Sequence, residues 1–251
     1  MAVNKITGTL FTDIEKLIGV SNTSIASVSG ITASTTPAFI TANLKSRYTP
    51  ATYSGTGALV DTVSGHNITI SGATYSSTQP ANFDNDGVND SMVSSTYTQP
   101  NADLSFGMWM NCDVNATGVM IVCGVTVPNG IGGLIYRASG RTASYYRGNR
   151  GISNVAGNPA YAPRNQWAYL CWSRNASTRL IRMWKCDVNG VTQLVSTTGG
   201  SSTSASNTVN FMSPLQNHFD GKVGNFHVYD DDLGTTEWTQ NFNAQKAYYG
   251  L

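Results

Sequence analysis

The sequence predicts an all-β protein, an antiparallel β-sandwich with a short C-terminal helix, and three observations support this prediction. Strand-like runs follow one another from Leu104 onward and are separated by turns rich in Gly, Asn and Ser. Charged residues are only 12% of the 251 residues, below the usual quarter, whereas Ser, Thr, Asn and Gly are abundant. Only the last segment has helical spacing. This mixture favours strands with polar outer faces over a helical bundle.

Residues 1–36 differ from the rest of the chain, and we expect an N-terminal arm there, followed by one large sandwich over residues 37–251. Segments 14–20 and 25–31 share a pattern of Ile, then Leu or Val, then Gly. Two copies of so short a unit cannot bury their own apolar side chains, so they should dock on another surface. The alternative is that they form an extra strand or helical turn that covers one end of the chain's own sandwich. As attachment residues we expect Ile14, Leu17, Val20, Ile25, Val28 and Ile31.

Strands account for most of the expected sandwich. In the run 104–112, large apolar residues alternate with smaller or more polar ones such as Ser105 and Gly107, which predicts one buried face and one mixed face. Asn189 and Gly190 form a dipeptide that is a strong signal of a hairpin turn. The expected strands from Leu104 onward cover residues 104–112, 119–125, 133–137, 143–147, 166–174, 178–186, 191–197 and 208–211.

The chain ends with a predicted strand and a predicted helix. Residues 223–229 alternate with the period of a strand whose two faces are both at least partly covered. Thr235 or Thr236 is the expected N-cap of the helix, and Glu237 in its first turn is favourable at the positive end of the helix dipole. Large apolar residues then recur at helical spacing, so the helix should pack back on the sheet. Gly250 is the expected stop.

Several segments occur in a recognisable order. The closing strand opens with Phe219-Asp220-Gly221-Lys222-Val223-Gly224, an acidic turn follows, and the helix reads Asn241-Phe242-Asn243-Ala244-Gln245-Lys246. This order resembles the C-terminus of the concanavalin A-like, laminin-G-like jelly rolls common in bacteriophage virion proteins. Residues 40–44 depart from that family's usual Leu-Tyr-Leu-Asp opening. Over about residues 37 to 251, further segments resemble the family's opening segments and core strands: 51–57, 61–67, 72–75, 82–90, 104–110 and 165–170.

The resemblance implies a virion structural protein, either a head decoration or a component of the tail or of a fibre. Its partners would be other capsid or tail proteins, and it would form a homo-oligomer or a symmetric array on the particle. No apolar run reaches the roughly 18 residues of a membrane span, and no signal peptide is recognisable, so we expect synthesis in the host cytoplasm. A formal net charge of +1 offers no electrostatic reason for binding nucleic acid or an anionic membrane.

The cysteines Cys112, Cys123, Cys171 and Cys186 lie in or beside strand-like runs and do not have metal-site spacing. A reducing compartment favours free, buried thiols over disulfides. The alternative is a bridge between Cys171 and Cys186, which lie on consecutive predicted strands and could be joined after particle release.

Catalysis finds no support in the sequence. Retaining glycosidases place two carboxylates about 5 to 5.5 Å apart, but the two glutamates, Glu15 and Glu237, lie in the arm and in the last helix. The aspartates fall mainly at strand ends and turns, where they serve the backbone. No Gly-x-Ser-x-Gly nucleophile motif occurs. We therefore expect a protein that is not an enzyme, and a glycan-degrading enzyme is the disfavoured alternative.

The sharpest polar cluster is the segment 84–90, in which Asp84, Asp86 and Asp90 surround Gly87. Alternating carboxylates around a glycine can wrap a calcium ion with oxygen ligands, and laminin-G-like domains often hold calcium at one rim. The alternative is a hairpin turn whose role is mainly structural. Apart from calcium we expect no cofactor.

Aromatic residues beside loops rich in Gly and Asn are candidates for a sugar-binding platform, because aromatic faces stack on pyranose rings. Most aromatic residues of a sandwich belong to its core or sheet faces, which is the structural alternative. A platform here would make the chain a carbohydrate-binding adhesin for host surface glycan, with or without calcium. The candidate glycan-binding residues are Tyr145, Tyr146, Arg147 and Tyr161.

Overall fold

The computed structural model describes residues 27–28, 31–32, 37–95, 97–99, 102–113, 119–121, 123–124, 133–137, 141–145, 164–198, 207–211, 214–217 and 219–251. The chain divides into the units Met1–Pro37 and Ala38–Leu251. In the first unit, β1 (Ser27–Val28) and β2 (Ile31–Thr32) pair antiparallel, with Val28 opposite Ile31. The other expected attachment residues, Ile14, Leu17, Val20 and Ile25, lie outside the described residues, so the arm stays a prediction.

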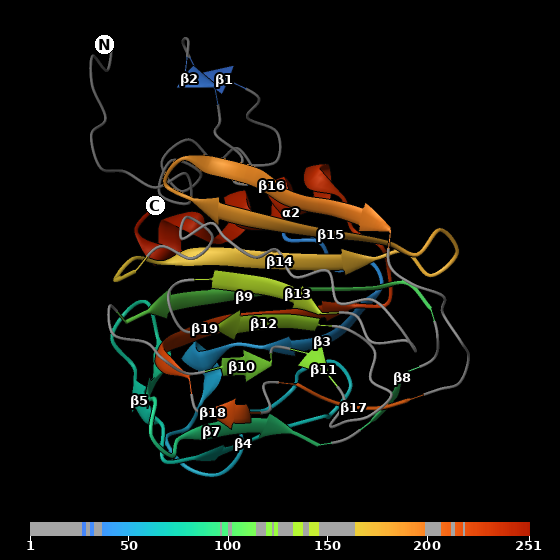
Figure 1. The fold of residues 1–251 in the computed structure, drawn as a ribbon. Coiled ribbons are helices and arrows are strands. Elements are labelled where there is room, and N and C mark those ends of the chain that lie inside the picture. The colour runs from blue at the N-terminus through green and yellow to red at the C-terminus, as the bar shows by residue number, and fades with distance from the viewer. Residues whose placement is uncertain are drawn as a thin grey trace, which may run out of the picture. The chain divides into compact units, whose positions relative to one another are not determined.

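One antiparallel sheet forms the centre of the second unit and confirms the predicted all-β fold (Figure 1). β19 pairs with β9 along one edge. Along its other edge it pairs with β6 and then with β3. The strands, in spatial order, are β16 (Gly190–Thr198), β15 (Leu180–Asp187), β14 (Ala168–Arg174), β9 (Leu104–Cys112), β19 (Asp220–Tyr229), β6 (Asn82–Asp86) and β5 (Thr74–Ser76), with β3 (Leu44–Tyr48) beside β19.

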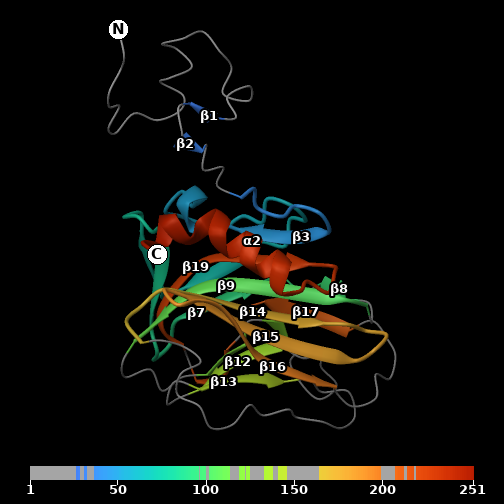
Figure 2. The same ribbon diagram turned by 90° about the horizontal axis from the view of Figure 1, so that it is seen from above.

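Shorter strands form the second layer of the sandwich. The predicted strand 119–125 is divided, because β10 pairs with β12 and β18 whereas β11 pairs with β17. Figure 2 shows β12 and β13 on the side of the large sheet that faces away from the C-terminal helix. The strands are β4 (Ile68–Ser71) with β7 (Ser91–Ser94); β8 (Tyr97–Gln99), β17 (Asn207–Phe211) and β11 (Cys123–Gly124); and β13 (Arg141–Tyr145), β12 (Gly133–Arg137), β10 (Val119–Ile121) and β18 (Pro214–Asn217).

The main core lies between these layers. The apolar side chains of β9 that the alternating pattern places on one face, from Leu104 to Cys112, are all buried there. Phe106 stacks on Trp172 with ring centroids 5.0 Å apart, and Tyr48 stacks on Phe226 at 5.5 Å. Because large apolar side chains gain free energy in proportion to the area they remove from water, this face stabilises the pairing of the layers.

The other face of the large sheet is covered by α2 (Thr235–Gln245) and a 3₁₀ turn, η3 (Lys246–Tyr249). The predicted mixed face of β9 is therefore wrong, since Ser105, Gly107 and Trp109 are fully buried. Trp238 of the helix packs among aromatic side chains of the sheet. A second core thus lies between the helix and the sheet.

In the described part of the chain no helix is long and apolar enough to cross a membrane.

The N-terminus of α2 differs in detail from the prediction. Its N-cap is Gly234, whose N–H donates to Glu237 Oε2 over 3.0 Å, so the expected cap at Thr235 or Thr236 is wrong. Thr235 instead accepts a hydrogen bond from the indole of Trp184. The C-terminal stop is confirmed, because Gly250 has a φ of 77°, which favours glycine. The other described helical turn is η2 (Pro50–Thr52).

The prediction of free, buried thiols is confirmed for Cys171 and Cys186, the pair for which a bridge was the alternative. Cys112 is buried as well, and the side chain of Cys123 lies outside the described residues. Burial, and then the neighbouring thiol of Cys186, raises the pKa of Cys171 well above its usual range. A thiol held in its protonated form is a poor nucleophile and a poor metal ligand. These side chains therefore serve as small apolar residues of the two cores.

Candidate functional site

The predicted calcium segment forms the turn between β6 and β7. Asp86 Oδ1 accepts the N–H groups of Val88 and Asn89, at 2.8 and 3.3 Å. Asp90 is buried, and its Oδ2 accepts the N–H of Asp86 over 2.9 Å. These hydrogen bonds support the turn interpretation, although the two strands belong to different sheets and do not form a hairpin.

Four carboxylates gather at this end of the sheet, and we call Asp84, Asp86, Asp113 and Asp220 the acidic rim. Asp220 begins β19 and lies opposite Asp86 in the ladder, while Asp113 N–H donates to the carbonyl of Asp220 over 3.3 Å. Partial burial, and then the charges of Asp113, Asp84 and Asp86, raises the pKa of Asp220. Two members, Asp113 and Asp220, were not among the predicted site residues because they come from strands distant in sequence.

The acidic rim is not arranged as a metal centre. Within the described residues, no group of three or more His, Cys, Asp or Glu side chains could hold a metal ion. Asp84 and Asp86 are exposed, whereas Asp90 is directed toward the Asp86 amide and lies tightly against Gly72. Calcium binding by Asp84, Asp86 and Asp90 stays a prediction.

Of the predicted glycan-binding residues, Tyr145 is the one that lies among the described residues. Tyr145 is the last residue of β13 and lies opposite Gly133 in the ladder with β12. Among the described strands, β13 is the last of its four-stranded sheet, and Tyr145 is its C-terminal residue. Tyr146, Arg147 and Tyr161 lie outside the described residues.

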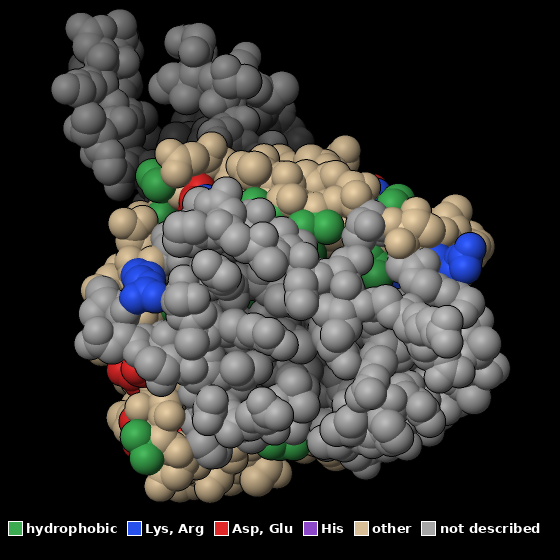
Figure 3. Space-filling model, in the orientation of Figure 1, with side chains coloured by type: hydrophobic (Ala, Val, Ile, Leu, Met, Phe, Trp, Pro, Cys, Tyr) green, Lys and Arg blue, Asp and Glu red, His purple; other side chains and the backbone are tan. Residues whose placement is uncertain are grey.

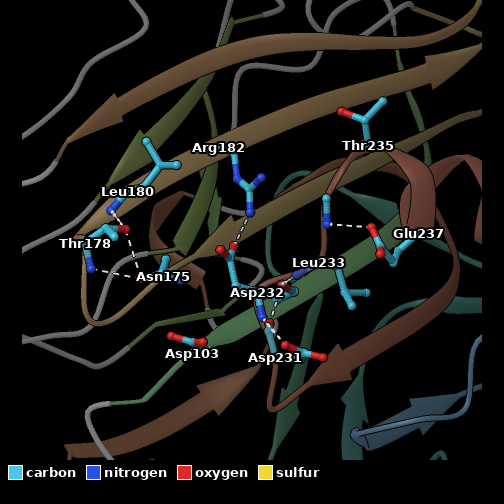
Figure 4. Close-up of polar contacts among 12 residues, drawn as sticks. Asp103, Asn175, Thr178, Leu180, Arg182, Asp231, Asp232, Leu233, Thr235 and Glu237 are labelled. Carbon is cyan, nitrogen blue, oxygen red and sulfur yellow. Dashed lines mark hydrogen bonds and ion pairs between the residues drawn. The ribbon is translucent and has the colours of Figure 1, made fainter.

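The opposite end of the large sheet carries a dense polar network that holds α2 in place (Figure 4). Arg182 of β15 forms an ion pair with Asp232, and Ser105 Oγ donates to the carbonyl of Asp231 while accepting the N–H of Leu233. Asp103 accepts the N–H of Ala176. The side chains that converge here bind one another and the backbone, so their role is structural.

Three tyrosines are buried in the core between α2 and the large sheet, which we call the helix–sheet layer, and burial there changes their pKa. Tyr169, Tyr229 and Tyr249 all have a raised pKa, in each case chiefly because burial disfavours the phenolate. His227 is also fully buried, and burial followed by the charge of Arg47 lowers its pKa well below the usual value. A nucleophile or base must be accessible and activated. The three tyrosines and His227 are instead buried, and burial disfavours their charged forms.

The visible surface of the described residues is mostly polar. Figure 3 shows backbone and uncharged polar side chains with scattered hydrophobic and charged ones on one face. The large hydrophobic residues exposed in the described part are valines: Val60, Val63, Val88 and Val188. Singly exposed valines are ordinary for a protein surface.

Comparisons with known proteins identify the fold. No family model matches the sequence, and no curated protein is similar to it. The structure of Trypanosoma rangeli sialidase matches 84% of this chain and 34% of the sialidase chain, with a TM-score of 0.60 and 13% identity. The binding domain of Botulinum Neurotoxin DC in complex with SialylT matches 82% of this chain and 52% of that chain, with a TM-score of 0.58 and 14% identity.

A third structure, described as a receptor binding domain, matches 80% of this chain and 51% of that chain, with a TM-score of 0.57 and 15% identity. This chain therefore spans between a third and about half of the length of the chains that it matches. At such low identity the likeness concerns architecture alone. The chain thus has a β-sandwich fold that occurs in parts of larger proteins.

Proposed function

We propose that the sandwich is a non-enzymatic carbohydrate-binding domain, and that the chain is a virion surface protein that recognises glycan on a host cell. The observation that carries the proposal is the fold shared with a toxin binding domain in complex with SialylT and with a sialidase. The sialidase binds sialic acid and the toxin domain binds SialylT, so sialylated glycans are the first class to test. The mainly polar, weakly charged surface is compatible with recognition through hydroxyl groups.

The end of β13 is the proposed contact region. Tyr145 is the last residue of β13, and Tyr146 and Arg147 follow it directly in the sequence. Tyrosine combines an apolar ring that can stack on a sugar with a hydroxyl group that can bind its polar edge. Arginine can add a bidentate contact to a carboxylate such as that of a sialic acid.

Two observations favour binding over hydrolysis. Sialidases use a tyrosine nucleophile, and the tyrosines with a raised pKa in the described part of the chain, Tyr169, Tyr229 and Tyr249, are buried. The sequence also contains only Glu15 and Glu237 as glutamates, and Glu237 caps the N-terminus of α2.

The virion assignment is supported by the order of segments from Phe219 to Lys246 and by the two similar apolar units of residues 1–36. In this proposal the arm attaches to capsid or tail proteins, and the sandwich faces the host. Substituting Ile14, Leu17 and Val20 with Ser in the full-length chain should prevent its co-sedimentation with particles that lack the protein. Normal incorporation of this variant would contradict the attachment role.

A glycan array with the full-length chain tests the binding function. We expect retention on sialylated glycans, loss of retention in Tyr145→Ala/Tyr146→Ala, and weakening in Arg147→Ala. Arg141→Ala is the matched control, because Arg141 begins the same strand at its opposite end. The proposal is wrong if the chain is retained on no glycan of the array, or if release of reducing sugar shows that the chain cleaves its ligand.

A further inference from the structure

The first residues of the sandwich unit form a strap across one end of the helix–sheet layer, and we define the strap as residues 38–44. Its backbone is bound to α2 at two points. Gln240 Nε2 donates to the carbonyl of Ala38 over 2.7 Å, and the N–H of Ile40 donates to Asn241 Oδ1 over 2.9 Å. From the sheet, Tyr229 Oη donates to the carbonyl of Ile40 over 3.0 Å. Residues 38–40 of the strap are therefore held by neutral hydrogen bonds.

Phe39 is the side chain of the strap that covers the sheet. Its ring is half-buried and lies 4.4 Å from the His227 imidazole, centroid to centroid. Arg47 lies over the same phenyl ring, with its guanidinium carbon 5.2 Å from the centroid. Since His227 has no solvent-exposed area, release of Phe39 would admit water to the imidazole. The strap thus closes over a titratable group.

The surroundings of His227 oppose a positive charge. Arg47 of β3 is its direct cross-strand neighbour, and Gly107 of β9 lies on its other side. Its Nδ1 is 3.5 Å from Tyr169 Oη, and its Nε2 has no hydrogen-bond partner among the described residues. The remaining titratable groups near this row, Tyr229 and Cys171, are neutral when buried. An imidazolium here would face a cation and no described carboxylate.

Charged groups farther along the strap do not offset this repulsion. Lys45 pairs with Asp230 over 2.8 Å, and Asn43 Nδ2 donates to Asp231 Oδ2 over 3.0 Å. Asp61 accepts the backbone N–H of Arg47 and binds the residues of its own loop. The acidic side chains near β3 are therefore already engaged away from the imidazole.

We propose that His227 makes the strap an acid-sensitive closure: protonation of the imidazole in mild acid releases residues 38–44 from α2 while the sandwich remains folded. The neutral ring fits beneath Phe39, and the charged ring requires water. Opening of the strap supplies that water at the loss of its hydrogen bonds to α2 and Tyr229, of the hydrogen bonds of Asn43 with Asp230 and Asp231, and of the ring contacts of Phe39. Unfolding of the sheet would instead expose both hydrophobic cores to water.

The size of the effect follows from proton linkage. Hydration in the open strap moves the pKa of His227 toward its ordinary value of about 6.5, whereas burial lowers the pKa in the closed form. Because Arg47 of β3 stays beside the ring, this value sets the upper limit of the effect. At that limit the open form gains population below pH 6.5 by about tenfold for each pH unit, and the opening equilibrium rises by about 30-fold between pH 8 and pH 5.

Hydrogen exchange of the full-length chain, read by mass spectrometry and corrected for the intrinsic pH dependence of exchange, tests this proposal. Peptides that cover residues 38–44 should lose protection between pH 8 and pH 5, by up to about 30-fold. Peptides from β9 and β14 should lose much less. A parallel loss in all peptides would mean global unfolding and would overturn the proposal, as would an unchanged strap.

Substitutions separate His227 from other titrating groups. His227→Gln should remove the pH dependence of the strap, and His227→Phe provides a second test if the amide is poorly tolerated in this buried position. His66→Gln is the matched control, because His66 lies outside the helix–sheet layer, and it should retain the dependence. Phe39→Ala should expose the strap already at pH 8. Retention of the full acid response in both His227 variants would refute the role of this residue.

Discussion

Substitution of Gly107 by Ala tests whether the helix–sheet layer is as closely packed as described. An added Cβ would lie 2.5 Å from Tyr169 Cζ and 2.9 Å from Trp238 Cζ3, and the Tyr169 hydroxyl would be nearer still. Ordinary carbon contacts begin near 3.5 Å. Both rings are fully buried, so neither can move into solvent. The helix would have to shift away from the sheet.

The expected cost lies at the upper end of the range for overpacked cores, about 3 kcal/mol, because two large rings must move together. Urea unfolding followed by circular dichroism measures this cost. With a urea dependence of about 3 kcal/mol per molar for a chain of this size, the midpoint should fall by about 1 M. A fall with unchanged urea dependence would assign the loss to the folded state.

Two further variants make the reasoning refutable. Tyr169→Phe removes the nearest atom, so the double variant should be about 1 kcal/mol more stable than the sum of the single changes predicts. Gly55→Ala, at a positive φ of 91° with no neighbour within 4 Å, should cost only the backbone strain of about 1–2 kcal/mol. If Gly107→Ala unfolds at the midpoint of the wild type, or if the double variant is strictly additive, the close contact does not exist.

Other predictions follow from single contacts. Burial alone would raise the pKa of Asp61, but hydrogen bonds from a neighbouring serine and from backbone N–H groups outweigh it and lower the pKa below 3.8. The stability that ionised Asp61 contributes is therefore fully present above pH 3.8, and it is lost as the pH falls through the lower pKa of the folded state. Asp61→Asn should cost about 2 kcal/mol in urea unfolding at pH 7 and much less near pH 2. Tyr249→Phe leaves the N–H of Asn225 without its acceptor at 2.7 Å and should cost about 1–2 kcal/mol, measured in the same way. Glu237→Ala removes the acceptor for the N-cap N–H, and calorimetry should show a Tm lower by about 2–4 °C, corresponding to about 1 kcal/mol. Asp220→Asn should raise the Tm at pH 7 in the presence of a chelator, because it relieves repulsion from the other carboxylates of the acidic rim. At pH 3, where the Asp220 carboxyl is protonated, the variant should have no advantage. If the variant has a lower Tm than the wild type in the presence of calcium, the rim binds an ion.

The strands could be predicted from sequence because their signals are local. β9 covers the predicted residues 104–112, and Asn189 and Gly190 lie at the predicted hairpin turn. The division of 119–125 between two sheets could not be predicted, because it depends on which distant strands are available as partners. The N-cap was misassigned for a related reason: Thr235 is a good cap by type, but the indole of Trp184 binds its hydroxyl.

The candidate site was less predictable than the fold. Segment 84–90 was recognised from its composition, but the hydrogen bonds of Asp86 and Asp90 are those of a turn. Asp113 and Asp220 join the same end of the sheet from different strands, and no local pattern could signal this meeting. The proposed glycan contact at Tyr145 rests on the sequence and on the end of β13.

The sequence by itself determined the fold class, the course of most strands and the helix with its glycine stop, because alternation, turn chemistry and helical spacing act between near neighbours. Only the tertiary structure decided which polar and small residues are buried. Ser105, Gly107 and His227 lie on a face of the sheet that is covered by a helix more than a hundred residues after β9 begins. Burial, and with it the pKa of His227 and the fit of Gly107, depends on what packs from outside the strand, and that is a property of the whole fold.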